Sequence, residues 1–162
     1  MADNVEPAVE IRRTDIRSPE AQSLILALNA ELKARYPEEG ACHFRLEADE
    51  VAEGRGAFLV AFAPAQNPVA CGAIRRIDPE TSEIKRMYVK PEWRGKGIAG
   101  AMVSALEQEC LRLGVARIVL ETGVRQHEAI ELYARAGFER IAAFGEYMGK
   151  PLSVCFAKKL RV

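Results

Sequence analysis

A turn rich in glycine and basic residues is the most informative chemical feature of this sequence. Residues 82–89 read as a strand, the turn carries Arg94, Gly95, Lys96 and Gly97, and an amphipathic run follows. Glycine lets a backbone approach a ligand closely and adopt positive φ. No Ser, Thr, Asp or Asn stands directly before Gly97 to cap the first helical N–H groups, so an external anion would satisfy them. The pattern predicts a pyrophosphate site.

A dinucleotide site is the alternative that must be weighed first. The glycines of this turn spell G-x-G-x-x-G, and Glu121 lies at a spacing compatible with the acidic residue of that fingerprint. However, residues 91–94 lengthen the connection from strand to glycine beyond the tight first turn that the fingerprint needs. The turn also contains two basic side chains, which a dinucleotide motif does not require.

Two motifs together resemble the GNAT family of N-acetyltransferases. The turn is similar to the first signature of that family, R/Q-x-x-G-x-G/A, through Arg94, Gly97 and Ala99. The second signature, N-x-x-A-x-x-x-Y-x-x-x-G-F, is similar to the run from Gln126 to Phe138, although the family usually has Asn where this chain has Gln. The resemblance extends over about residues 70–160.

The resemblance implies an α/β (α+β) fold with a mixed seven-stranded sheet, splayed central strands and helices on both faces. The splay is expected between the strand ending at Val89 and the strand ending at Glu121. Strands that separate leave main-chain N–H and C=O groups facing a cleft, where an extended amide ligand can pair with them. The pantetheine arm of coenzyme A is such a ligand, so we expect main-chain contacts from residues 87–89.

The co-substrate implied by the resemblance is acetyl-CoA, with no metal. The expected cofactor-binding residues come from the strand end, the turn, the helix start and the second motif: Met87, Tyr88, Val89, Arg94, Gly95, Lys96, Gly97, Ile98, Ala99 and Gln126. Lys90 adds to the local positive charge. Gln126 can form hydrogen bonds as Asn does, but its side chain is one methylene longer.

Acetyl transfer to an amine needs a neutral amine, donors for the oxyanion and a proton for the departing thiolate. Tyr133, the tyrosine of the second motif, is the predicted acid, since a phenol holds its proton at neutral pH. The alternative for Tyr133 is a packing role on the apolar face of its helix. The main-chain N–H of Val89 is a candidate oxyanion donor.

Glu83 is the predicted base, acting directly or through water. A period of two places it on the same strand face as Lys85, Met87 and Val89, upstream of the thioester. An alternative is a surface glutamate paired with Lys85. Glu121, at the end of the opposing strand, is the rival base.

Composition places the chain among ordinary globular proteins. Of its 162 residues, 49% are apolar and 28% are charged, with a formal net charge of zero, so we expect one domain over residues 1–162, with residues 1–7 frayed. The neutral balance offers no field for nucleic acid or anionic lipid, and no apolar run approaches the roughly 18 residues of a membrane span. Four scattered cysteines, Cys42 among them, and only two histidines, His43 and His127, predict a reducing cytoplasm without disulfides or a zinc site.

Local patterns predict alternating strands and helices. A helix is expected from a Ser18 cap to Tyr36, with Pro19 at its first position. The other expected elements are strands at 8–13, 57–63, 69–77, 82–89, 115–121, 138–143 and 152–160, a hairpin turn at 64–68, and helices near 48–52, at 98–113 and at 126–136. The rest of 37–56 gives no clear pattern.

The resulting functional prediction is an N-acetyltransferase that acts on the primary amine of a small molecule. A protein or peptide amine is one alternative acceptor, and a non-catalytic acyl-CoA-binding domain is the alternative of another class. Residues 36–56 are expected to shape the acceptor pocket. The final strands are a candidate edge for a homodimer.

Overall fold

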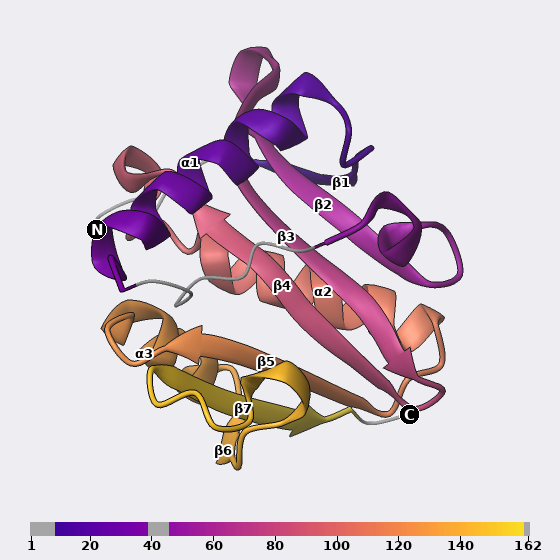
Figure 1. Cartoon of the computed structure of the whole chain (residues 1–162). Coiled ribbons are helices and arrows are strands. Elements are labelled where there is room, and N and C mark those ends of the chain that lie inside the picture. Colours follow the sequence, from indigo (N-terminus) through magenta and orange to yellow (C-terminus); the bar gives the residue numbers. More distant parts are fainter. Residues whose placement is uncertain (1–8, 39–45, 161–162) are drawn as a thin grey trace, which may run out of the picture.

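The computed structural model describes residues 9–38 and 46–160, so the expectations for residues 1–7, Cys42 and His43 lie outside the described residues (Figure 1). Seven strands form one mixed sheet in the order β1-β2-β3-β4-β5-β7-β6. Their bounds are β1 Glu10–Arg13, β2 Gly56–Ala63, β3 Asn67–Asp78, β4 Thr81–Val89, β5 Arg117–Gly123, β6 Glu139–Ile141 and β7 Ser153–Lys159. The helices are α1 Pro19–Arg35, α2 Ile98–Arg112 and α3 His127–Arg135. The predicted fold class is confirmed. Among the described residues, no helix is long and apolar enough to cross a membrane.

The predicted start of α1 is confirmed in detail. The Ser18 Oγ accepts a hydrogen bond from the Ala21 N–H at 3.1 Å, and Pro19 is the first helical residue. Other boundaries differ from the expectation. The helix expected near residues 48–52 is a single 3-10 turn, Ala48–Val51, and β6 is much shorter than residues 138–143. Short edge strands of this kind limit unwanted pairing with other chains.

The two central strands are parallel and then separate. Their ladder runs from the pair Thr81 and Arg117 to the pair Ile84 and Leu120 and does not continue, although β4 extends to Val89. Figure 1 shows β4 and β5 close together where they begin and diverging toward their C-terminal ends. Outside the splay, β4 stays paired with β3, and β5 with β7. The predicted splay is therefore present.

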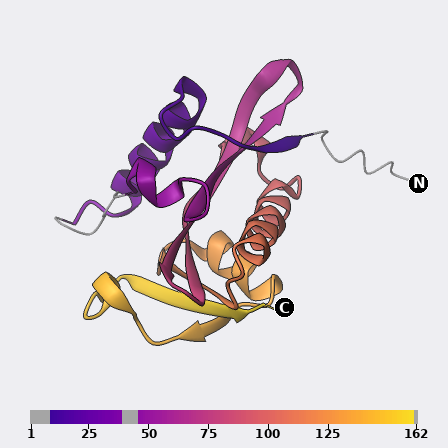
Figure 2. The same ribbon diagram turned by 90° about the vertical axis from the view of Figure 1, so that its right-hand side faces the viewer.

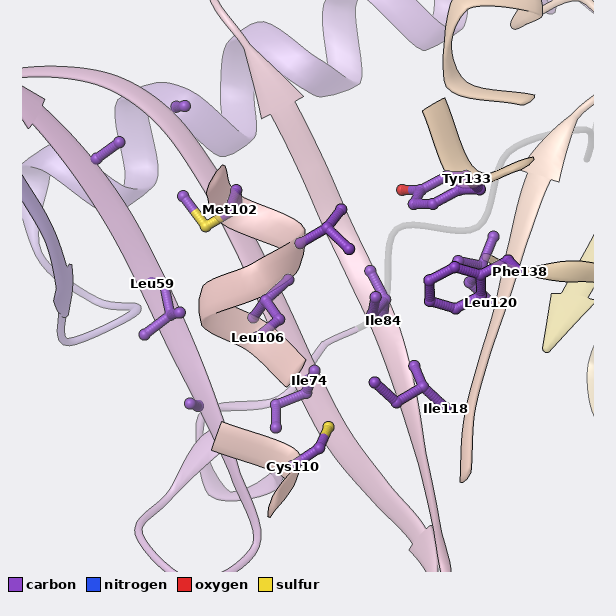
Figure 3. Close-up of a cluster of buried hydrophobic side chains, with 14 of the residues drawn as sticks. Leu59, Ile74, Ile84, Met102, Leu106, Cys110, Ile118, Leu120, Tyr133 and Phe138 are labelled. Atoms are coloured by element: carbon purple, nitrogen blue, oxygen red, sulfur yellow. The ribbon is translucent and has the colours of Figure 1, made fainter. Parts of the chain in front are cut away.

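Helices cover both faces of the sheet (Figure 2). On one face, Leu24 and Leu28 of α1 pack with side chains of β2, β3 and β4 in one buried cluster. On the other face, α2 and α3 bury a larger cluster that includes Met102, Leu106 and Tyr133 (Figure 3). The two faces of the sheet are therefore covered by different helices.

A bulge interrupts β4 shortly before the strand ends. Cys71 of β3 pairs with Tyr88, and Ala73 pairs with Lys85, so two residues of β4 stand opposite one residue of β3, Gly72. Arg86, one of the two, adopts φ of 60°, a conformation uncommon for residues other than glycine.

The bulge overturns one expectation drawn from strand periodicity. Met87 and Val89 pack against the cluster that contains α2. Glu83 points to the opposite face, because its neighbour Ile84 belongs to the α2 cluster. The extra residue reverses the alternation, so Met87 and Val89 do not share a face with Glu83 and Lys85.

Gly72 provides the space into which Met87 packs, which predicts a stability effect. A Cβ at position 72 would lie 2.7 Å from Met87 Sδ and 3.0 Å from Leu106 Cδ1. Gly72→Ala should therefore lower the free energy of unfolding by about 1–3 kcal/mol through overpacking. Urea denaturation measures this.

Gly100→Ala is the matched control, because nothing lies within 4 Å of a Cβ there and the residue sits in the first turn of α2. Helix propensity predicts that it is neutral or stabilises by up to about 1 kcal/mol. Equal stability of the two variants would contradict this account of the bulge.

Candidate active site

A cavity of about 660 Å³ opens where β4 and β5 separate. Its walls come from α1, the second half of β4, the glycine turn with the start of α2, the end of β5, and α3. Ligand sites typically occupy roughly 300–1,000 Å³ and lie where sheet strands diverge. The cavity therefore joins the two sequence motifs in one place.

The glycine turn presents an uncapped helix start to this cavity. Gly97 is the N-cap residue of α2, with φ of 82° and no capping side chain, and Gly95 also has positive φ. Both glycines, together with Ile98 and Ala99, border the cavity. The free N–H groups and the helix dipole favour an anion there, as the sequence predicts.

Of the basic residues predicted around the turn, Arg94 borders the cavity, whereas Lys90 and Lys96 are absent from its lining. The Arg94 Nε donates to the Val89 carbonyl oxygen at 2.8 Å, and its Nη2 pairs with Glu31 of α1 at 2.7 Å. Arg94 thereby ties the turn to both β4 and α1. The Lys96 Nζ lies over the Trp93 ring, 6.0 Å from its centroid.

The ends of β4 and β5 border the cavity on either side of the splay. Met87, Tyr88 and Val89 all line the cavity, as expected. On the opposite side, the Gly123 N–H donates to Gln126 Oε1 at 3.0 Å, so the side chain of Gln126 terminates β5. The role of these residues toward a cofactor stays a prediction.

Tyr36, the first residue of the segment expected to shape the acceptor pocket, borders the cavity through a contact that the sequence did not predict. Its hydroxyl accepts a hydrogen bond from the Arg125 N–H at 2.9 Å, and its side chain borders the cavity. This contact joins the end of α1 to the loop after β5. Residues so far apart in sequence leave no local pattern that pairs them.

Glu83 is buried, with 1% of its surface exposed, and is absent from the cavity lining. Arg75, its cross-strand neighbour on β3, donates to Oε1 from Nε at 3.0 Å, and the Tyr147 hydroxyl donates to Oε2 at 2.6 Å. The alternative of a surface glutamate paired with Lys85 is therefore wrong. Lys85 lies instead 3.8 Å from Glu146.

Glu121, the rival base, does line the cavity. Burial, and after it the negative charge of Glu83, raise the pKa of its carboxyl to about 7, while Lys85 opposes the shift. A carboxylate that titrates near neutral pH can accept a proton from an ammonium group. Glu83 thus influences the Glu121 carboxyl through its charge while lying outside the cavity lining.

The Tyr133 side chain both packs in the core and borders the cavity, and its role as the acid stays a prediction. It is 4% exposed and packs edge to face against Phe138, with ring centroids 5.6 Å apart, yet it also borders the cavity. In Figure 3 its hydroxyl points away from Phe138 and Leu120. Burial raises the pKa of the phenol, so the hydroxyl is protonated at neutral pH.

Comparison with known proteins agrees with the motif resemblance. A model of the Acetyltransferase (GNAT) family matches residues 25–138. The chain is 36% identical over 156 residues to the IAA acetyltransferase of Azospirillum brasilense, covering 95% of this chain and 99% of that relative.

Solved structures share the fold. A Klebsiella pneumoniae protein, provisionally described as an acyl-CoA N-acyltransferase, superposes with a TM-score of 0.82 at 30% identity, covering 96% of this chain and 99% of that one. A GNAT acetyltransferase from Elizabethkingia anophelis with acetyl-CoA bound superposes with a TM-score of 0.67 at 17% identity, covering 94% and 98%. At the latter identity the likeness concerns the fold alone.

The raised pKa of Glu121 predicts a stability change with pH. A carboxyl whose pKa is higher in the folded than in the unfolded protein contributes stability below its unfolded pKa, near 4.5, and loses it as pH rises through about 7. Glu121→Gln should therefore gain stability over the parent between pH 5 and pH 8, by the order of 1–3 kcal/mol. Urea denaturation at several pH values measures the difference.

Glu139→Gln on β6 is the control, because Glu139 is an exposed strand glutamate. Its stability difference from the parent should stay nearly constant with pH. A Glu121→Gln difference that is equally flat would mean that the carboxyl of Glu121 titrates at its ordinary pH.

Proposed function

The chain belongs to the GNAT family of acetyltransferases, and we propose that it transfers the acetyl group of acetyl-CoA to the primary amine of a small molecule. The reaction would proceed by direct attack of the amine through a tetrahedral intermediate. One observation carries the proposal: an uncapped helix start, two open strand edges and a carboxyl with a pKa near 7 border the same cavity. These three features match a pyrophosphate, an amide-containing arm and an ammonium group.

The chain has suitable groups for the co-substrate. The N–H groups at the start of α2 would bind the pyrophosphate, and the open edge of β4 at residues 87–89 would pair with the pantetheine amides. Bound acetyl-CoA supplies the thioester. The acetyl-CoA bound to the Elizabethkingia anophelis protein supports this choice of ligand.

Three groups of the chain would then handle charge and protons. Glu121 takes a proton from the acceptor ammonium and leaves the neutral amine, which attacks the thioester carbonyl. The Val89 N–H donates toward the oxygen that becomes negative. Tyr133 gives its proton to the departing sulfur, so that free thiol is released. Glu83 is the positioning residue behind Glu121, since it is buried against Arg75 and Tyr147.

We favour a small acceptor over a peptide, because side chains of α1 and the residue after it border the cavity. Leu28, Leu32 and Tyr36 of the α1 segment border the cavity on the side opposite the strand edges. The name of the Azospirillum brasilense relative, IAA acetyltransferase, points in the same direction. A protein acceptor and a non-catalytic acyl-CoA-binding role are the outcomes against which the proposal is tested.

The direct test follows free thiol released from acetyl-CoA with a pool of amines, with products identified by mass spectrometry. We expect release that depends on an acceptor, with free amino acids or other small amines acetylated faster than peptides carrying the same terminal residue. Binding of coenzyme A without turnover on any amine would support the non-catalytic alternative. Rates that grow with peptide length would make the cleft an open groove and overturn the small-molecule assignment.

Substitutions of the proposed base and of the proposed acid should change the kinetics in different ways. Glu121→Gln should remove the rising limb of kcat/KM near pH 7, because the base is lost, while Glu83→Gln should shift that limb to lower pH by removing a negative charge. Tyr133→Phe should lower kcat by about 10²-fold, the usual scale for a lost general acid.

Affinity for coenzyme A, measured by calorimetry, controls for damage to the fold in all three variants. It should stay close to the parent value. If the pH profile of kcat/KM for Glu121→Gln matches that of the parent, Glu121 is not the base. If the rate of the chemical step is unchanged in Tyr133→Phe, Tyr133 is not the acid.

A further inference from the structure

The hydroxyl of Tyr36 is held in a fixed position at the end of β5. Its oxygen accepts a hydrogen bond from the Arg125 N–H at 2.9 Å. It also fills the space beside Gly123, because a Cβ at that position would lie 1.8 Å from the Tyr36 hydroxyl oxygen. Tyr36 is 6% exposed and, together with Gly123, borders the cavity. The glycine therefore makes room for a phenol that reaches β5 from the end of α1.

A tyrosine hydroxyl can donate one hydrogen bond as well as accept one. In the part of the chain that the structure describes, the oxygen of Tyr36 accepts from Arg125, but no group accepts the hydroxyl proton. Burial raises the pKa of the phenol, so the hydroxyl keeps that proton at neutral pH. A hydroxyl whose oxygen already accepts a hydrogen bond is polarised and donates more strongly. A buried donor without an acceptor is costly, so an oxygen of a ligand in the cavity is the expected partner.

The main-chain donors near the end of β5 are already used. The N–H groups of residues 123–126 donate, in chain order, to Gln126 Oε1, the Leu152 carbonyl oxygen, the Tyr36 hydroxyl and the Gly123 carbonyl oxygen. These four residues therefore offer a ligand no main-chain N–H. A donor on this side of the splay has to come from a side chain, and Tyr36 and Gln126 both border the cavity there.

The Tyr36 hydroxyl lies level with the part of β4 that would bind the cofactor arm. Counted on from the last pair of the ladder, Ile84 and Leu120, residues 87–89 of β4 come opposite residues 123–125, and the bulge changes this count by one residue. An extended amide chain, as a strand does, presents polar groups on both of its edges. Residues 87–89 can pair with one edge, so a carbonyl oxygen on the other edge needs a donor at the end of β5.

We propose that the Tyr36 hydroxyl donates a hydrogen bond to an amide carbonyl oxygen of the pantetheine arm of coenzyme A. This inference rests on the proposed function and adds a binding residue for its co-substrate. It assigns Tyr36 to the cofactor, whereas the sequence predicts that the segment beginning at this residue shapes the acceptor pocket. The end of α1 would then cover the arm, and the tyrosine would take the place of a main-chain donor of β5.

Calorimetry with two ligands tests this contact. The ligands are coenzyme A and 3′-phosphoadenosine diphosphate, which is coenzyme A without the pantetheine arm. Tyr36→Phe should lower the affinity for coenzyme A by about 3- to 10-fold, the scale of one neutral hydrogen bond, because the ring stays and the donor is lost. The affinity for the nucleotide should equal that of the parent. If both affinities fall equally, or if neither falls, the hydroxyl does not bind the arm.

A second variant moves the phenol without changing Tyr36 itself. Gly123→Ala puts a methyl group where the Tyr36 hydroxyl lies, so it should reproduce the selective loss of affinity for coenzyme A. The matched control is Tyr147→Phe, since Tyr147 also borders the cavity but donates its hydroxyl proton to Glu83 Oε2 at 2.6 Å. This control should bind both ligands as the parent does. An equal loss of affinity for coenzyme A in Tyr147→Phe and Tyr36→Phe would overturn the specific role of Tyr36.

These affinities do not depend on turnover, so failure of this inference can be told from failure of the proposed function. A parent that acetylates no amine, yet binds coenzyme A more tightly than the nucleotide by a margin that Tyr36→Phe reduces, would refute acetyl transfer and support the contact. A parent that binds both ligands equally would refute the contact, because the arm would add nothing. A Tyr36→Phe variant that keeps its affinity for coenzyme A and raises only KM for the amine would assign the hydroxyl to the acceptor and overturn the inference.

Discussion

When two parallel strands separate, the main-chain groups along their inner edges lose their partners, and the rest of this structure accommodates that loss. The outer edges of β4 and β5 stay paired with β3 and β7, so the sheet remains continuous on both sides of the gap. Near the end of β5, side-chain oxygens of Gln126 and Tyr36 accept from the N–H groups of Gly123 and Arg125. The groups left open lie along the cavity, where a ligand with amides of its own can pair with them.

The second constraint is electrostatic. Glu83 and Glu121 lie on one face of neighbouring strands, but their surroundings differ. Glu83 is buried with a cation and a phenol that hydrogen-bond to both of its oxygens, whereas Glu121 meets the cavity and carries the raised pKa. Removal of one partner from a buried ion pair is costly, so Arg75 and Glu83 depend on each other. The negative charge of Glu83 then contributes to the raised pKa of Glu121.

The sequence predicted those parts of the site whose structure is determined by residues close together in the chain. The cap at Ser18, the glycines that begin α2 and the second motif with Tyr133 each have a signature within a few residues, and each lies where expected. No local pattern signals that the side chains of β4 exchange faces of the sheet after Lys85. A bulge adds one residue to a strand whose apolar pattern continues on both sides of it, and only the register against β3 reveals it. The hydrogen bonds of Tyr36 and Tyr147 were not predicted for a related reason, because their partners lie far away in the chain.

The bulge in β4 decides which side chains at the end of the strand pack into the core. Without the extra residue, the side chains of Met87 and Val89 would point toward α1, and Gly72 would need no space for Met87. With it, those side chains pack against α2, and their main chain stays at the open edge where the cofactor arm would bind. The same residue insertion places Arg86 toward α1, beside Asn29. The extra residue therefore turns two side chains of β4 into the core while the main chain of the same residues stays at the edge of the cavity, and replacing the bulge with regular strand would reverse those faces.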